Sequence, residues 1–101
     1  QLAGQNNTSG ANNTAFGSQA FQNNSSGANT VAIGYLAAQN TTSSGNTAIG
    51  SEALSANTSG TVNVAIGRSA LKANTTAAQN TAVGALALTA NTTGTANVAK
   101  G

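Results

Sequence analysis

The chain has 101 residues, of which 4% are charged, whereas about 25% is usual for soluble domains. It contains no Cys and no His, and Glu52 is its only acidic side chain. One chain therefore cannot form a nucleophile–base pair or a pair of catalytic carboxylates, and it offers few metal ligands. We expect no enzyme activity, no metal site and no cofactor.

The three cations, Arg68, Lys72 and Lys100, give a net charge of +2. Three scattered cations do not form the dense basic patch that displaces counterions from nucleic acid, so we expect no nucleic-acid partner. We expect Arg68 and Lys72 to lie near Glu52 of the preceding repeat, as solvated charge. No apolar run approaches the roughly 20 residues that span a bilayer, so we expect no membrane insertion of this segment.

One repeat occupies the whole chain, because Asn recurs at every seventeenth position in two columns. The first column is Asn6, Asn23, Asn40, Asn57, Asn74 and Asn91, and the second is Asn12, Asn29, Asn46, Asn63, Asn80 and Asn97. We expect these side chains to hydrogen-bond along stacked ladders, an interpretation that we favour over sugar binding. The pattern predicts a single repeat domain over residues 1–101, which we expect to be a segment of a longer fibre.

The glycine position differs between the first units and the later ones. Gly17 lies five positions after Asn12, whereas Gly50 lies four positions after Asn46. The following interval, from glycine to the next Asn, compensates for this change, so the total stays at 17. This compensation predicts that the fold holds the length of the whole unit constant.

Two short strands are predicted in each unit, at residues 47–49 and 51–54 in the third one, with a bend at Gly50. Residues 57–60 are predicted to form the return turn, because Asn caps its own backbone. No unit offers a stretch of about 10 residues with helical periodicity. The sequence therefore predicts an all-β fold, a parallel β-roll or β-solenoid of six 17-residue coils.

Large apolar side chains recur in two columns, which we expect to form the core. They are Phe16, Ile33, Ile49, Ile66 and Val83, and Phe21, Leu54, Leu71 and Leu88. About two such side chains per coil, each worth about 1.5–3 kcal/mol when buried, barely offset the cost of ordering the coil. We therefore expect obligate self-association, with further apolar faces buried between chains.

Four segments carry a family resemblance: residues 29–34 (NTVAIG), 46–50 (NTAIG), 63–67 (NVAIG) and 80–84 (NTAVG). The last three are each followed by two variable residues and Ala-Leu. The pattern resembles the head repeats of YadA-like trimeric autotransporter adhesins, and similar repeats occur in phage tail fibres. The resemblance covers nearly the whole chain, although the common repeat of the family is shorter. It implies a left-handed parallel β-roll, three chains per fibre, and a surface adhesive or spacer role.

Together, these features predict a non-catalytic structural or adhesive fibre segment of a bacterial surface adhesin or a phage tail fibre. The expected location is extracellular, at the cell surface or on a virion. The expected partners are copies of the chain itself, as a homotrimer, and a host surface protein or glycan. The alternative is a self-assembling extracellular filament, in which chains stack end to end through uncapped coils.

Overall fold

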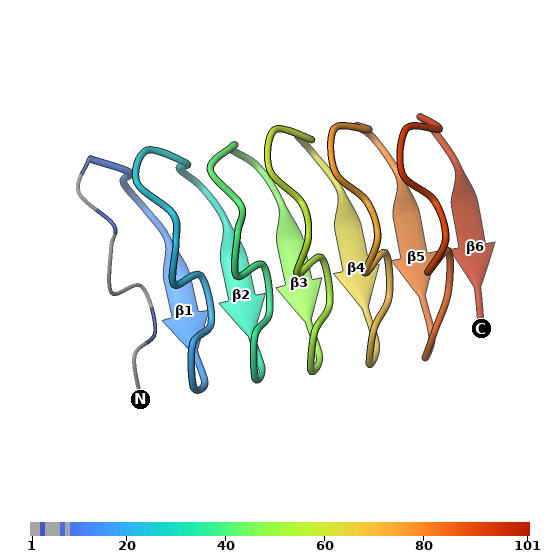
Figure 1. Ribbon diagram of the computed structural model, residues 1–101, viewed down its shortest axis with the longest axis horizontal. Coiled ribbons are helices and arrows are strands. Elements are labelled where there is room, and N and C mark those ends of the chain that lie inside the picture. Colours follow the sequence, from blue (N-terminus) through green and yellow to red (C-terminus); the bar gives the residue numbers. More distant parts are fainter. Residues whose placement is uncertain (1–2, 4–6, 8) are drawn as a thin grey trace.

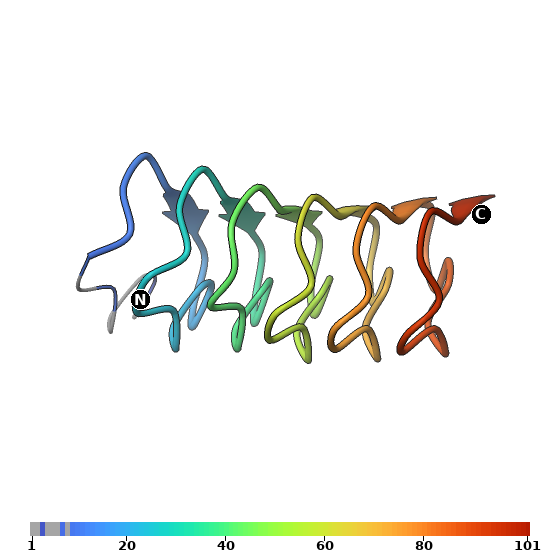
Figure 2. The same ribbon diagram turned by 90° about the horizontal axis from the view of Figure 1, so that it is seen from above.

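The computed structural model describes residues 3, 7 and 9–101. Within this part of the chain, six short strands form one parallel sheet in sequence order (Figure 1). They are β1 (Thr14–Phe16), β2 (Val31–Ile33), β3 (Thr47–Ile49), β4 (Val64–Ile66), β5 (Thr81–Val83) and β6 (Val98–Lys100). Successive coils stack along the long axis, and all strands lie along one side (Figure 2). The fold is therefore an all-β parallel β-solenoid, as the repeat predicts.

Each strand is short and has alanine at its centre. In β2 to β5 a buried Ala is flanked by Thr, Val or Ile, which are residues that favour strands. The central residues pair from strand to strand, as Ala32 does with Ala48 and Ala48 with Ala65. Since side chains alternate across a strand, the central Ala points into the solenoid and both flanking side chains point outward.

The strand register gives the true length of each coil. Thr14 pairs with Val31, a step of seventeen positions, but Val31 pairs with Thr47, a step of only sixteen. The following pairs, such as Thr47 with Val64, return to the longer step. The prediction of a constant unit length is therefore wrong.

The missing residue falls in the return turn of the short coil. Thr41 takes the place that Asn57 has in the next coil. The backbone N–H of Thr41 donates to the carbonyl of Ala38, and the backbone N–H of Asn57 donates to the carbonyl of Leu54, so both residues close the same kind of turn. Two residues later, the Ser43 hydroxyl donates to the carbonyl of Gly60, three residues after Asn57. The turn between Thr41 and Ser43 is therefore one residue short, while the sheet stays in register.

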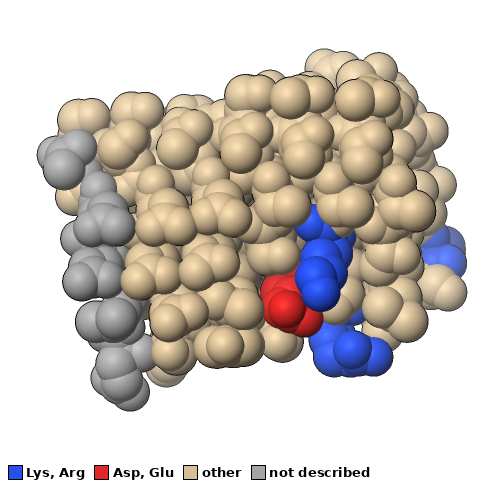
Figure 3. All heavy atoms as spheres, viewed as in Figure 1, with Lys and Arg blue, Asp and Glu red and all other residues tan. Residues whose placement is uncertain are grey.

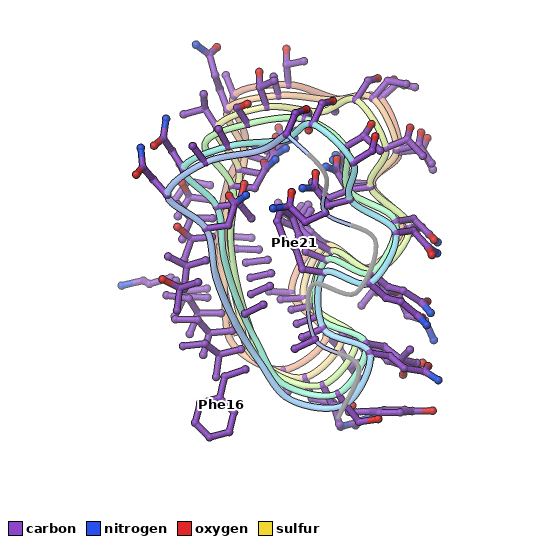
Figure 4. All side chains as sticks on the ribbon, turned by 90° about the vertical axis from the view of Figure 1, so that its left-hand side faces the viewer. Phe16 and Phe21 are labelled. Atoms are coloured by element: carbon purple, nitrogen blue, oxygen red, sulfur yellow. The ribbon has the colours of Figure 1, made fainter. Side chains whose placement is uncertain are left out.

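The interior holds mostly alanine and one column of larger side chains. Phe21, Leu54 and Leu71 are fully buried, and Leu88 is half-buried. Figure 4 shows Phe21 pointing into the coil. Ala38 takes this position in the coil between Phe21 and Leu54, so the largest side chain of the column stands beside the smallest. The second predicted core column is confirmed.

The first predicted column does not lie in the core of this chain. Exposed fractions are 74% for Phe16, 38% for Ile33, 37% for Ile66 and 40% for Val83, while Ile49 is half-buried. These residues flank the central Ala of each strand, so the alternation of the strand turns them outward, as Phe16 shows in Figure 4. The interior position is filled by alanines: Ala32, Ala48, Ala65 and Ala82.

The second predicted strand, at residues 51–54, is also wrong, because this segment is a series of overlapping turns. The N–H of Ala53 donates to the carbonyl of Gly50 at 3.2 Å, and that of Ser55 donates to the carbonyl of Glu52 at 3.2 Å. Every second residue has a positive φ, 64° at Glu52 and 54° at Leu54. The chain thus curls around the interior, and Leu54 is brought inside. The predicted bend at Gly50 is confirmed by its φ of 128°.

Glycine follows each of the first five strands because neighbouring coils touch there. A Cβ on Gly50 would lie 2.7 Å from the carbonyl carbon of Gly67 in the next coil, closer than carbon atoms can pack. Each of these glycines also has a φ between 122° and 133°, a region that other residues rarely adopt. They are Gly17, Gly34, Gly50, Gly67 and Gly84.

The register predicts that whole coils are interchangeable. Deletion of residues 47–63 joins Asn46 to Val64 and removes one coil, so we expect a soluble, folded protein with a modestly lower Tm. Deletion of residues 47–54 shifts the ladder and buries polar groups without partners, so soluble yield should collapse. Equal damage from the two deletions, measured by soluble yield and thermal melting, would contradict the solenoid.

Val62 provides a test of backbone strain. It has a φ of 55°, unusual for a β-branched residue, and the equivalent position holds Asn12, Asn29 and Gly45 in earlier coils. Val62 is 58% exposed, so few contacts are lost on replacement. Val62→Asn should therefore raise the free energy of unfolding by about 1 kcal/mol in chemical denaturation. Val64→Asn, in strand β4, is the control and should lower it.

Candidate functional site

Two buried ladders of asparagine run along the solenoid. In the first, the Oδ1 of each Asn accepts a hydrogen bond from the backbone N–H of the Asn in the next coil. These distances are 2.9 Å from Asn63 to Asn46, 3.0 Å from Asn80 to Asn63, and 2.8 Å from Asn97 to Asn80. The Nδ2 of Asn63 donates to the carbonyl of Ala77 at 2.9 Å, so the same amide also holds the turn of the next coil.

The second ladder closes the return turns. The Nδ2 of Asn57 donates to the carbonyl of Gly60, three residues later, at 3.0 Å, which confirms the predicted turn. The amides also bond between coils, at 2.9 Å from Asn74 to Asn57 and at 3.1 Å from Asn91 to Asn74. The predicted ladders are therefore present in the later coils.

In the earlier coils the predicted ladder residues lie on the surface. Asn12 donates to Asn29 at 3.3 Å, and Asn23 donates to Asn40 at 2.7 Å, in two exposed amide pairs. Asn6 lies outside the described residues. These pairs bond between coils as predicted, but they occupy a different position from the ladders of the later coils. The short coil shifts the earlier repeats by one residue, so that equal spacing in the sequence no longer means equal position in the fold.

The buried positions of the earlier coils belong to neighbours that the sequence analysis missed. The Nδ2 of Asn24 donates to Asn7, and the backbone N–H of Thr30 donates to Asn13 at 2.9 Å. Thr41 continues the second ladder by accepting from the Nδ2 of Asn57 at 3.3 Å. Two adjacent asparagines stand at 12–13 and at 23–24, so either member of each pair could belong to the ladder. An alignment of the repeats by their strands, in place of their asparagines, assigns Asn13 and Asn24 to the ladders.

The second candidate surface is the outer face of the sheet, which carries two columns of side chains. One column is Thr14, Val31, Thr47, Val64, Thr81 and Val98, and the other is Phe16, Ile33, Ile49, Ile66, Val83 and Lys100. From β1 to β5 the outer face holds no charged residue. It is therefore a flat, mainly apolar strip along the molecule.

Glu52, Arg68 and Lys72 lie outside these two columns, whereas Lys100 ends the second one. The Nζ of Lys72 lies 3.4 Å from the Oε1 of Glu52 in the preceding coil, which confirms their predicted proximity. Figure 3 shows the acidic side chain with basic side chains beside it, while most of this face is uncharged. Both side chains are substantially exposed, so water and salt screen the pair and it adds little stability.

Groups that could support chemistry are scarce. Among the described residues, no cluster of three or more His, Cys, Asp or Glu side chains could hold a metal ion. The described chain has no helix that could cross a membrane. Comparison with protein-family models, with curated protein sequences and with solved structures gives no significant match. The groups that the described surface offers to a partner are amides, hydroxyls and the apolar side chains of the outer face.

The two environments of asparagine make a matched test. Asn63→Ala removes bonds to Asn80 and Ala77 inside the solenoid, leaving buried groups unpaired, and should cost about 2–4 kcal/mol of stability. Asn40→Ala, at a predicted ladder residue without a positive φ, removes an exposed amide pair with Asn23 and should change stability by less than about 0.5 kcal/mol. Chemical denaturation measures both, and similar losses would refute the distinction between buried and exposed ladders.

Proposed function

We propose that this chain is a non-catalytic structural segment of an extracellular or virion fibre, with three chains side by side. The observation that carries the proposal is the direction of its hydrogen bonds. Backbone and Asn amide bonds between coils run along the long axis, and in the described chain every buried side-chain N or O has a partner. A rod held in this way resists bending and stretching without any chemistry of its own.

An adhesive role is supported by exposed amides on the earlier coils. The exposed amide pairs of Asn12 with Asn29 and of Asn23 with Asn40 present stacked donors and acceptors at the spacing of the coils. Sugar hydroxyls and peptide groups are the natural partners of such an array. A host surface protein or a glycan is thus the partner class that this surface fits, in a bacterial surface adhesin or a phage tail fibre.

The association of several chains is supported by the thin core. Each coil buries about one large apolar side chain, while the Ile of β2 or β4 remains partly in solvent. A chain with so little buried apolar surface gains much from covering the remainder. Three chains with their sheets toward a common axis would bury these columns, in agreement with the trimer that the sequence resemblance implies.

A fibre segment must lengthen in one direction as coils are added. Duplication of residues 47–63 should extend the long dimension of the molecule by about 4.8 Å, the spacing of neighbouring strands, with no change in cross-section. Small-angle X-ray scattering measures both quantities. A control in which the duplicated segment has a scrambled sequence should not lengthen the rod in this way. Growth of the native duplication in all three dimensions would overturn the proposal.

A further inference from the structure

Two pairs of surface amides join the coil that follows β1 to the coil that follows β2. The Nε2 of Gln39 donates to the Oε1 of Gln22 at 3.1 Å, and the Nδ2 of Asn23 donates to the Oδ1 of Asn40 at 2.7 Å. The equivalent positions of the later coils hold Ser55 with Ala56, Lys72 with Ala73, and Thr89 with Ala90. The amide pairs are therefore a local feature of a repeating fold.

Stacking of the coils does not require these amides. The N–H of Asn23 donates to the carbonyl of Gln39 at 2.8 Å, and the N–H of Ala73 donates to the carbonyl of Thr89 at 3.2 Å. The second of these bonds joins two coils without an amide side chain on either residue. All four amide side chains are at least partly exposed, so another molecule can reach them.

The second coil of the two presents a donor and an acceptor that the fold leaves unused. Within the described chain, the Nδ2 of Asn40 has no acceptor and the Oε1 of Gln39 has no donor. The bonds to Asn23 and Gln22 already hold both side chains, so little conformational freedom is lost when they bind a further group. A donor and an acceptor on adjacent residues match two neighbouring hydroxyl groups, the recurrent feature of a sugar ring.

An exposed aromatic ring lies in the same series of turns. Tyr35 is the single tyrosine of the chain, precedes Gln39 by four residues and is 52% exposed. One turn closes from the N–H of Ala37 to the carbonyl of Gly34, and the next closes from the N–H of Gln39 to the carbonyl of Leu36. The equivalents of Tyr35 in other coils are Ser18, Ser51, Arg68 and Ala85. Stacking thus does not require the ring, whose apolar face can pack against the C–H groups of a sugar.

The surroundings of these residues favour an uncharged partner. The first 51 residues contain no charged side chain, and Glu52 is paired with Lys72 at 3.4 Å. A carboxylate or sulfate group on a sugar would lose water here without gaining a counter-charge. A protein partner would need an apolar centre in its interface, which four amides do not provide.

We infer that the amides and the ring together bind a neutral oligosaccharide. This amide patch consists of Gln22, Asn23, Tyr35, Gln39 and Asn40. The inference rests on the adhesive part of the proposed function, to which it adds the class of partner and the binding residues. The patch lies outside the two columns of the outer face, so chains that meet through that face leave it open.

The class of partner is tested by NMR titration of the native chain with neutral tetrasaccharides of glucose, galactose and mannose. At least one should shift the side-chain amide signals of Gln39 and Asn40, and its sulfated form should bind about tenfold more weakly or less. No shift with any neutral tetrasaccharide at millimolar concentration would overturn the inference. Equal binding of the sulfated form, or shifts caused only by a mixture of short peptides, would also overturn it.

The binding residues are tested by two variants, Gln39→Ala/Asn40→Ala and Tyr35→Ala. Each should weaken binding by about tenfold or more, with a nearly unchanged Tm, because the backbone bonds between coils remain. Thr89→Ala, in the column of Gln39 but three coils further on, is the matched control and should bind like the native chain. Undiminished binding in the first two variants, or an equal loss in the control, would refute the assignment of the patch.

A second patch can be built where the later coils lack one. The variant Lys72→Gln/Ala73→Asn/Ala85→Tyr/Thr89→Gln/Ala90→Asn places the same five residue types at equivalent positions. Titration should then shift signals of residues 72–90 as well as those of residues 22–40, with similar dissociation constants. Shifts confined to residues 22–40 would refute the sufficiency of the five residues. A rod that lengthens with added coils but binds no neutral sugar would refute this inference alone and leave the fibre function in place.

Discussion

Hydrogen bonds between coils constrain everything else in this molecule. A backbone group or an amide at one level must meet its equivalent at the next level, so each coil has to present the same polar atoms at the same place. Asn63 illustrates the demand, because its amide bonds both to Asn80 and to the turn at Ala77. The glycine column reflects the same close contact between coils, since the backbone of Gly67 leaves no room for a Cβ on Gly50. The repetition in the sequence is thus a direct record of the contact between coils.

The constraint also explains the small core. Alanine at the centre of each strand lets the opposite wall of the coil approach the sheet, and one larger side chain per coil fills what remains. Phe21 beside Ala38 restores part of the volume where the leucine column is interrupted. The other large apolar residues, such as Ile33 and Ile66, have no room inside and lie on the outer face. A chain of this kind combines a small apolar core with many satisfied buried polar groups, and its other large apolar side chains remain partly exposed.

How much could be predicted from the sequence depends on whether a feature repeats or is local. The parallel β-solenoid, the return turn at Asn57 and the buried column of Leu54 and Leu71 all follow from the repeat period. The inward side of the strands was misjudged because Ile looks like a core residue, and only the alternation around Ala48 shows that it cannot be. The series of turns at Glu52 and Leu54 has no signature, since neither residue favours a positive φ. In the early coils the sequence assigns the ladder positions to the wrong member of each Asn-Asn pair, because two adjacent asparagines fit the repeat equally well.

The short turn between Thr41 and Ser43 has a consequence for how such a gene can change. The short coil stacks on its longer neighbours without a break in the sheet, because the difference is absorbed where the chain faces solvent. Recombination between repeats of unequal length can therefore yield a folded product, provided that the strands remain aligned. The number of coils can then change while each coil keeps the residues that stacking requires.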